Sequence, residues 1–319
     1  MFTYKSYVKI LSLILLSIII GSFIYIYFYS KIYPIPLFHR VSLDAKMKFL
    51  RDRVDKDSID TIIIGSSIGL NNIQGITLED SSDNIKHVLN LSSLALTTTQ
   101  VEQLSNLIFL FPNTKRVIYS SQFEDWSENL LFEDNKINFA KKYIELGKKH
   151  IDLAYAFYTF KHLIEFIKHN WEWEKKYAPN TTNHGLSFDR TGSVPLEMYG
   201  ENINHEMFSK PPLDIRISKE NPLALERIIK KLQLKNIHFY FIIEPYRQYM
   251  IDKYSDIYLT KENFTQISKK LTEKYNEKFL DLHEKLHLGD EHFVDREHLN
   301  SNASIITAKE VAEFIDKHE

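Results

Sequence analysis

Residues 61–67 read Thr-Ile-Ile-Ile-Gly-Ser-Ser, a run of β-branched residues that ends in a glycine and two serines. A short, continuous apolar run of this kind is typical of a parallel strand buried on both faces. Similar runs, with helical patterns between them, occur at residues 87–91, 116–119, 237–243 and 278–282. Strands separated by helices predict an α/β fold: a doubly wound, five-stranded parallel sheet with helices on both faces.

Residues 10–30 contain no charged side chain. As a helix this segment is about 31 Å long, close to the ~30 Å thickness of a bilayer's hydrocarbon core. The apolar core of a signal peptide is shorter, about 7–15 residues, and is followed by small residues at a cleavage site. This segment instead ends in bulky rings of the kind found at membrane interfaces: Tyr25, Tyr27, Phe28 and Tyr29. We therefore expect residues 10–30 to be an uncleaved transmembrane anchor that follows a short N-terminal tail, residues 1–9.

The composition narrows the classes of function. The chain has 319 residues, with 40 Lys and Arg against 42 Asp and Glu, a net charge of −2. Because there is no strong positive field, nucleic acid is a poor candidate partner. The absence of cysteine excludes a disulfide framework, a thiolate zinc site, an iron–sulfur cluster and a cysteine nucleophile. Lysines flank the apolar segment on both sides, so the positive-inside rule gives no orientation.

The remainder of the chain divides into a linker and one large domain. Residues 31–40 contain the run Tyr-Pro-Ile-Pro, which predicts a stiff, extended linker. Residues 41–319 form the predicted α/β domain, which a helix over residues 301–317 closes. An insertion at about residues 122–222 separates the third and fourth strands; it is helical at first and irregular later. A connection of this length is usually an insertion or a functional lid.

Gly65-Ser66-Ser67 directly follows the first predicted strand. Ligands of open parallel sheets bind beyond the carboxyl ends of the strands, so a serine at this place is well positioned as a nucleophile. The same residues also fit a helix N-cap, because serine is a favoured cap and glycine permits the turn. The phosphate-binding patterns G-x-x-x-x-G-K-[ST] and G-x-G-x-x-G are both absent.

Residues 295–300 read Asp-Arg-Glu-His-Leu-Asn and lie between the fifth strand and the last helix. An Asp three residues before a His allows the carboxylate to orient the imidazole and to stabilise its protonated form. The alternative is a solvated loop in which Asn300 or Ser301 caps the helix. A metal site is a further alternative, since five candidate ligands lie close in sequence: His287, His292, His298, Asp290 and Asp295. Their spacing fits no standard zinc pattern, so we expect no metal.

These two motifs occur in the order Ser, Asp, His, after the first and the last strand. Both would lie at the same edge of the sheet, which is the arrangement that a Ser–His–Asp triad needs. With these motifs the chain resembles the SGNH (GDSL-type) hydrolase superfamily, in its membrane-anchored polysaccharide acylation branch of DltD-like and alginate O-acetylation proteins. The similar blocks are residues 63–67, 89–92, 241–245 and 295–300.

The resemblance implies a flavodoxin-like sheet and roles for three residues. Ser67 would be the nucleophile, His298 the base, and Asp295 the group that orients the base. The glycine and the asparagine that supply the family's oxyanion hole are missing from the corresponding blocks. The remaining candidate donors are the backbone N–H groups of Ser67, Ser93 or Ala95 and the side chain of Gln122.

The expected function is that of a membrane-anchored serine acyl-transfer enzyme, an O-acyltransferase or esterase, that modifies a cell-surface polysaccharide without a cofactor. The resemblance implies a single-pass protein of the cytoplasmic (inner) membrane with its catalytic domain outside the cytoplasm. It also implies three partners: the lipid bilayer, a glycan or acylated substrate, and a membrane-bound O-acyltransferase. The alternative is a catalytically inactive SGNH-fold subunit that binds glycan or scaffolds that transferase. Nothing in the sequence indicates the long apolar tunnel that a lipase or thioesterase would need.

Aromatic residues in and near the insertion favour a carbohydrate acceptor: Trp126, Trp171, Trp173 and Tyr177. Such rings stack on sugars, but they also fill protein cores. Residues 185–190, with the sequence Gly-Leu-Ser-Phe-Asp-Arg, lie in the same insertion and are expected to line the cleft.

Overall fold

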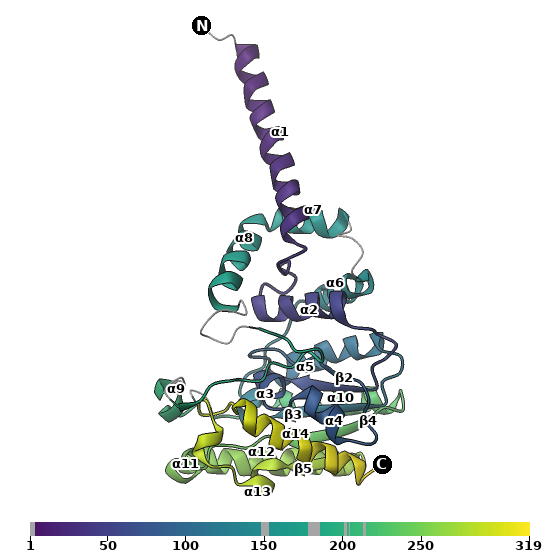
Figure 1. Cartoon of the computed structure of the whole chain (residues 1–319), viewed down its shortest axis with the longest axis vertical. Helices are drawn as coiled ribbons and strands as arrows, with labels where there is room; N and C mark the ends of the chain where they lie inside the picture. The colour runs from purple at the N-terminus through teal and green to yellow at the C-terminus, as the bar shows by residue number, and fades with distance from the viewer. Residues whose placement is uncertain (1–3, 148–152, 178–185, 201–202, 204, 213–214) are drawn as a thin grey trace. The chain divides into compact units, whose positions relative to one another are not determined.

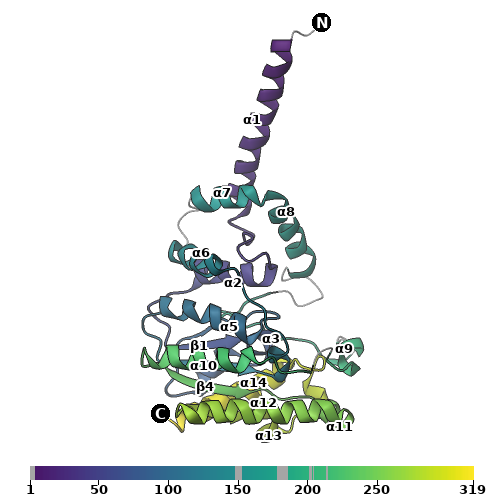
Figure 2. The same ribbon diagram turned by 180° about the vertical axis from the view of Figure 1, so that it is seen from behind.

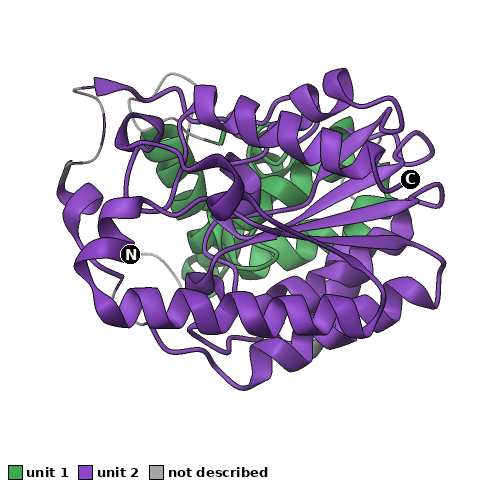
Figure 3. Cartoon of the chain, turned by 90° about the horizontal axis from the view of Figure 1, so that it is seen from below, with its two compact units in different colours: residues 1–53, 142–186 green, residues 54–141, 187–319 purple. Residues whose placement is uncertain are grey.

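The computed structural model describes residues 4–147, 153–177, 186–200, 203, 205–212 and 215–319. The chain forms two units, which Figure 3 shows in different colours. Residues 1–53 and 142–186 make up the first unit, and residues 54–141 and 187–319 make up the second. Every candidate site residue named from the sequence motifs and strand ends belongs to the second unit: Ser67, Ser93, Ala95, Gln122, Asp295 and His298.

The second unit is built on one sheet of five parallel strands, which confirms the predicted α/β class. The strands are β1 (Thr61–Gly65), β2 (Val88–Asn90), β3 (Arg116–Ser121), β4 (His238–Ile243) and β5 (Lys278–Asp281). Their order is β2-β1-β3-β4-β5, the order of flavodoxin-like sheets. Because all strands run the same way, their carboxyl ends meet at one edge, where Gly65 is paired with Ser120.

Helices cover both faces of this sheet (Figure 1, Figure 2). One face packs against α4 (Gly75–Ser81) and α14 (Ser301–Asp316). Alternate strand residues supply this core, among them Ile63, Ile118 and Ile242, all fully buried. This alternation follows from the period of two in a β-strand.

The opposite face of the sheet packs against α5 (Thr98–Leu104), α10 (Glu220–Gln233) and α12 (Ser255–Lys274). Aromatic side chains dominate it. Phe241 of β4 stacks on Phe279 of β5 with 6.1 Å between ring centroids and also contacts Phe264 of α12. α5 is followed directly by a 3-10 helix, η1 (Ser105–Leu110).

Trp126 belongs to this aromatic core. It ends a 3-10 helix, η2 (Phe123–Trp126), and its side chain is fully buried. The indole lies edge-on against Phe264, with 4.8 Å between ring centroids, and against Phe241, with 6.5 Å between centroids. Core packing rather than sugar stacking is therefore its role, since no ring face is open to a ligand.

Several short elements complete the second unit. These are α3 (Ser67–Asn71), α9 (His205–Ser209), α11 (Gln248–Lys253), α13 (Leu282–Leu286) and η6 (Asp290–His292). A longer helix, α6 (Asp134–Glu145), runs from the second unit into the first. α3 is the element that matters most for the candidate site, because its first residue is Ser67.

The first unit consists of α1 (Tyr4–Tyr29), α2 (Val41–Arg53), α7 (Leu153–Lys161), α8 (Leu163–Glu172) and a π-helical turn (Trp173–Tyr177). Among the described residues, α1 is the one helix long and apolar enough to cross a membrane. α7 and α8 pack beside its C-terminal end (Figure 1). Phe23 stacks on Phe160 with 4.9 Å between centroids, and Asn170 donates to the Tyr25 hydroxyl at 2.9 Å. The end of α1 is thus part of a folded unit.

Candidate active site

Ser67 lies at the carboxyl end of β1, where the strand turns into α3. Gly65 permits this turn, because a Cβ at its position would overlap the carbonyl oxygen of Ser120 on β3. Ser66 is the N-cap of α3, and its hydroxyl accepts the N–H of Ile68 at 3.1 Å. Capping, the alternative role for these serines, therefore falls to Ser66. The hydroxyl of Ser67 is not the cap of α3, so it can form a hydrogen bond with another side chain.

Asp295 and His298 lie in a tight turn before α14. One carboxylate oxygen, Oδ1 of Asp295, accepts the backbone N–H groups of Glu297 at 2.9 Å and His298 at 2.8 Å. The turn is closed by the N–H of Val294, which donates to the carbonyl of His298 at 2.9 Å. Asn300 then caps α14, with its side chain accepting the N–H of Ala303. The i, i+3 spacing of Asp and His thus places both side chains on the same side of the turn.

Ser67, His298 and Asp295 form a continuous hydrogen-bonded chain. Nε2 of His298 lies 2.8 Å from Oγ of Ser67. Nδ1 of His298 lies 2.8 Å from Oδ2 of Asp295. The side chains of His298 and Asp295 are 19% and 20% exposed, so both are partly open to solvent. This is the nucleophile–base–orienting group arrangement of serine acyl-transfer sites.

The charges of the site favour a protonated imidazole beside an ionised carboxylate. Burial disfavours the charge on Asp295, but the opposite charge of His298 and its hydrogen bonds outweigh burial and lower the pKa of Asp295 to about 2. Burial also disfavours the charge on His298. The carboxylate of Asp295 outweighs it, with help from Glu297 and Asp125, and raises the pKa of His298 to about 9. The imidazole is therefore a strong proton acceptor that is neutral at alkaline pH.

Asn72 links the two parts of the candidate site, α3 and the 295–299 turn, by hydrogen bonds. It follows α3, is fully buried, and its Oδ1 accepts the N–H of Leu299 at 3.0 Å. Its Nδ2 donates to the carbonyl of Glu297 at 3.4 Å, and its own carbonyl accepts the hydroxyl of Thr307. The helix that begins with Ser67 is thus bound to the turn that carries His298. Sequence reasoning missed Asn72, since its partners are more than two hundred residues away.

Asp125 is a second group that sequence reasoning missed. It lies in η2, just after β3, and accepts the hydroxyl of Ser121 at 2.9 Å and the N–H of Gln122 at 3.2 Å. Burial raises the pKa of Asp125 to about 7, although hydrogen bonds from Ser66 and Ser121 oppose the rise. Its carboxylate is one of the charges that raise the pKa of His298. A carboxylate six residues beyond a predicted strand was the available signal.

Besides Ser67, three residues were candidates for the oxyanion hole, and their environments differ. Gln122 is fully buried, and its side-chain nitrogen donates to the carbonyl of Pro245 at 2.7 Å, so this donor is already in use. Ser93 is buried, and its hydroxyl has no hydrogen-bond partner among the described residues. Ala95 is exposed and has a positive φ of 52°. The structure thus brings Ser67, Asp295 and His298 together and turns the Gln122 amide to another partner.

The histidines and aspartates that suggested a metal near residue 290 have other partners. Both carboxylate oxygens of Asp290 bind the guanidinium of Arg247, at 2.8 and 2.7 Å. His292 lies 3.5 Å from the carboxylate of Glu291, and His287 has a positive φ of 46° at the end of α13. Asp295 and His298 belong to the triad-like chain, so these five residues do not converge on one point.

The insertion residues named as carbohydrate candidates belong mainly to the first unit. Trp171 is 65% exposed, with Nζ of Lys175 4.7 Å from its ring centroid, and Trp173 packs on Tyr177. Of residues 185–190, Gly185 lies outside the described residues. Leu186 is buried, and Asp189 accepts the N–H groups of Thr191 and Ser193, which makes this segment a structured turn.

Comparison with known proteins gives no family to which the geometry can be referred. No family model matches the chain, and no curated protein matches it. The case for a function therefore rests on the site itself.

Proposed function

We propose that this protein is a membrane-anchored serine acyl-transfer enzyme, an O-acyltransferase or esterase. The observation that carries the proposal is the Ser67–His298–Asp295 chain, with 2.8 Å at each of its two links. Three side chains from two distant parts of the sequence meet at one edge of the sheet in the order that nucleophilic catalysis requires. Asn72 holds the two parts in register.

The proposed reaction can be followed by the group that holds the proton at each step. Oγ of Ser67 donates its proton to Nε2 of neutral His298 and forms a bond to the acyl carbon of an ester. His298 then gives that proton to the leaving alcohol as the ester C–O bond breaks, and Asp295 stabilises the imidazolium in between. In the second half an acceptor hydroxyl gives its proton to His298 and bonds to the acyl carbon. The bond from that carbon to Oγ of Ser67 then breaks, and His298 returns the proton to Oγ. The acceptor is a sugar hydroxyl in a transferase and water in an esterase.

Membership of the SGNH hydrolase superfamily is part of this proposal. It is supported by the blocks quoted above, by the strand order, and by the placement of Ser67 after β1 and of Asp295 and His298 after β5. By that resemblance the substrate is a cell-surface polysaccharide, and the natural partner is a membrane-bound O-acyltransferase. The oxyanion donors would be backbone N–H groups, with Ser67, Ser93 and Ala95 as candidates.

The membrane part of the proposal is a single-pass anchor in the cytoplasmic membrane, with the acyl-transfer unit outside the cytoplasm. α1 has the length and hydropathy for one crossing. Its last turns are bound to α7 and α8 through Phe23 and Tyr25. Cleavage as a signal peptide would remove these partners and expose the aromatic rings that they cover. Retention of α1 is therefore favoured.

A second function is supported by one observation. The family's oxyanion-hole glycine and asparagine are missing, and the amide of Gln122 is bound to Pro245. A subunit without catalytic activity that binds glycan or scaffolds an O-acyltransferase would have no need of that hole. Since loss of one oxyanion donor costs about 10²–10³ in rate, a measurement of reactivity separates the two functions.

The test is labelling by a fluorophosphonate probe, which forms a bond to an activated serine. The detergent-solubilised full-length protein is compared with Ser67→Ala, His298→Ala and the exposed control Ser81→Ala. We expect the wild type and Ser81→Ala to be labelled and the other two variants to be silent. Absence of labelling of the folded wild type, both in detergent and in native membranes with its partner, would overturn the enzyme proposal in favour of the inactive subunit.

A further inference from the structure

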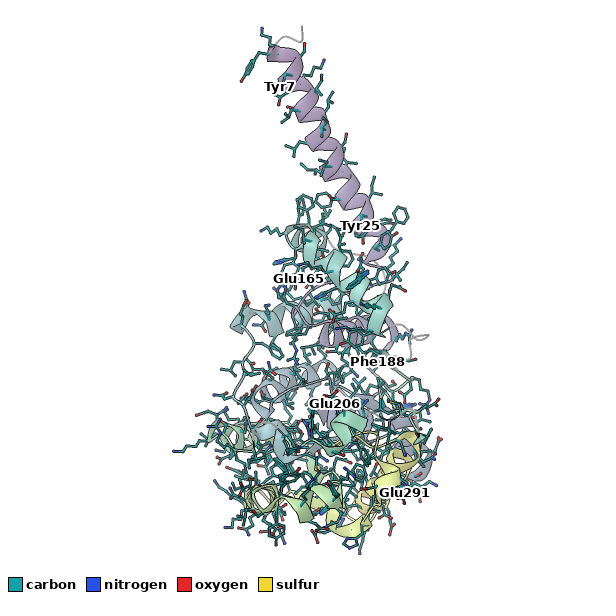
Figure 4. The ribbon with its side chains drawn as sticks, turned by 90° about the vertical axis from the view of Figure 1, so that its left-hand side faces the viewer. Tyr7, Tyr25, Glu165, Phe188, Glu206 and Glu291 are labelled. Atoms are coloured by element: carbon teal, nitrogen blue, oxygen red, sulfur yellow. The ribbon has the colours of Figure 1, made fainter. Side chains whose placement is uncertain are left out.

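Three histidines surround one carboxylate in the first unit, far in sequence from the proposed catalytic residues. Glu165 lies on α8 (Figure 4). Its Oε1 is 2.6 Å from Nδ1 of His39 and 3.6 Å from Nε2 of His169, and its Oε2 is 3.7 Å from Nδ1 of His162. The donor atoms of His39, His162 and Glu165 all lie within 4.8 Å of one another. From this arrangement we propose a binding site for a divalent zinc-like cation, with His39, His162 and Glu165 as ligands and His169 beside Glu165.

The ligand set has the spacing and chemistry of a zinc site. His162, Glu165 and His169 are separated by three and four residues, so they lie on one face of α8. His39 reaches them from the segment between α1 and α2. Imidazole nitrogens with one carboxylate oxygen suit zinc, whereas magnesium and calcium prefer oxygen ligands. The ligands of a tetrahedral zinc lie about 3.3 Å apart, which falls between the 2.6 and 3.7 Å that separate Glu165 from His39 and from His162 here.

Further polar groups adjoin the three ligands. Nε2 of His39 lies 3.5 Å from the hydroxyl of Tyr158, so coordination through Nδ1 of His39 directs its other ring N–H to that hydroxyl. His169 is 94% buried, and its Nδ1 has no hydrogen-bond partner among the described residues although Oδ2 of Asp44 lies only 3.7 Å away. Its Nε2 lies 3.6 Å from Oε1 of Glu165, so this buried imidazole adjoins the carboxylate ligand.

Asp44 is hydrogen-bonded to the backbone on both sides of His39. Its side chain is fully buried, and it accepts the N–H groups of Phe38 at 2.7 Å and Arg40 at 3.2 Å. These two residues flank His39, whose φ of +58° is rare for a residue other than glycine. One carboxylate thus fixes the backbone that carries His39 and faces the ring of His169. The ligand from the linker and the buried histidine of α8 therefore both adjoin the same carboxylate.

The site also offers carboxylates to a cation. Glu165 lies among the imidazoles, and the buried carboxylate of Asp44 lies 3.7 Å from Nδ1 of His169. The ligands can be reached from solvent, since His162 and Glu165 are 35% and 30% exposed and line a hollow of about 750 Å³. The ion would thus link the segment that follows α1 with helix α8.

The site is tested with zinc itself, independently of any acyl-transfer activity. The full-length protein in detergent is stripped with a chelator and titrated with zinc chloride by calorimetry, and bound metal is counted by mass spectrometry. The variants are His162→Ala and Glu165→Gln, both at partly exposed positions, and the control is His87→Ala, which removes an exposed histidine of the second unit. Circular dichroism of the zinc-free proteins checks that each is folded.

We expect one zinc per chain for the wild type and His87→Ala. Loss of a direct ligand should weaken binding by at least about 100-fold, because changes in outer-shell partners alone cost about 10–100-fold. Cobalt should give the visible absorption of a four-coordinate ion with the wild type and not with His162→Ala. A wild type that takes up no stoichiometric zinc, or zinc binding that is equal in the wild type and both ligand variants, would overturn the proposal. These residues would then form a hydrogen-bonded histidine–glutamate cluster that binds no metal.

Discussion

Oδ1 of Asn72 accepts the backbone N–H of Leu299 at 3.0 Å, so the residue that follows the helix of the proposed nucleophile is bound to the residue that follows the proposed base. The two residues are 227 positions apart in the sequence. The position of His298 relative to Ser67 therefore depends on a contact outside the proposed triad. Asn72 is a positioning residue in the proposed reaction.

Replacement of Asn72 by alanine should slow acylation of Ser67 while leaving the pKa of the base unchanged. A shift of about 1 Å in a catalytic group costs on the order of 10²-fold in rate, and Asn72→Ala frees the 295–299 turn to move by such an amount. Asn72→Asp keeps an acceptor for the N–H of Leu299 and should retain most of the rate. Fluorophosphonate labelling rates measured across the pH range provide both quantities. Equal rates for Asn72→Ala and the wild type would contradict the positioning role.

The rate of acylation should rise with pH up to about 9. Only neutral His298 can accept the proton of Ser67, and the carboxylate of Asp295 raises the pKa of His298 to about 9. By linkage the same ion pair stabilises the folded protein fully between pH 3.8 and 6.5. This contribution is lost as the pH rises through about 9 and as it falls through about 2. Labelling rates measured from roughly pH 6 to 10 give the apparent pKa of the base.

Glu297→Gln provides the control for this pH profile. Glu297 contributes to the raised pKa of His298 but has no hydrogen bond to its ring in the described structure. Its replacement should move the rise in rate to lower pH and leave the plateau rate near that of the wild type. A wild-type profile that already reaches its plateau near pH 6.5 would show that the charge of Asp295 does not act on the base in this way.

The predictable part of the site is the part that depends on strand ends. Ser67 and the 295–298 turn follow predicted strands, and carboxyl ends of parallel strands share an edge, so their meeting could be expected. Asn72 could not be found in this way, because its role depends on a tertiary contact. Gln122 also follows a strand, but its amide binds the carbonyl of Pro245. Strand ends predict which residues lie near one another and leave open where each side chain points.

The limits of sequence reasoning are clearest in the first unit. The spacing of His162, Glu165 and His169 is visible once α8 is known to be a helix, yet His39 and Asp44 join them only through the fold. Residues 61–64, by contrast, carry their strand preference locally, and the five-stranded sheet follows from such runs. Local preference determines the elements, and long-range packing determines which polar groups converge.

Glu244→Gln should stabilise the protein at alkaline pH. Glu244 is fully buried at the end of β4, Ser120 donates to its Oε1 at 2.9 Å, and burial raises its pKa to about 8. Because the folded state keeps a proton that the unfolded state loses above pH 4.5, the stability from Glu244 is complete below pH 4.5 and is lost as the pH rises through about 8. Glutamine mimics the protonated form. The gain at pH 9 should be about 3–5 kcal/mol, measured by urea unfolding.

Glu313→Gln, an exposed change on α14, is the matched control for that experiment and should leave stability unchanged at both pH values. At pH 4.5 the Glu244→Gln variant should match the wild type, since Glu244 is then protonated when folded. A variant that is less stable than the wild type at pH 9 would mean that Glu244 is ionised and paired in the folded protein, contrary to its position beside a single serine hydroxyl.

Retention of α1 can be tested directly on the expressed protein. Epitope tags at both ends should remain on one polypeptide of full length in the membrane fraction and should resist extraction by alkaline carbonate, because α1 is apolar along its length and Phe23 and Tyr25 are bound to α7 and α8. Protease added to intact spheroplasts should remove the C-terminal tag and leave the N-terminal tag protected. Signal-peptide cleavage would instead release a shorter chain without the N-terminal tag.

Phe160→Ala, which removes the stacking partner of Phe23, should reduce the thermal stability of the first unit without changing the membrane fraction, since the crossing depends on α1 itself.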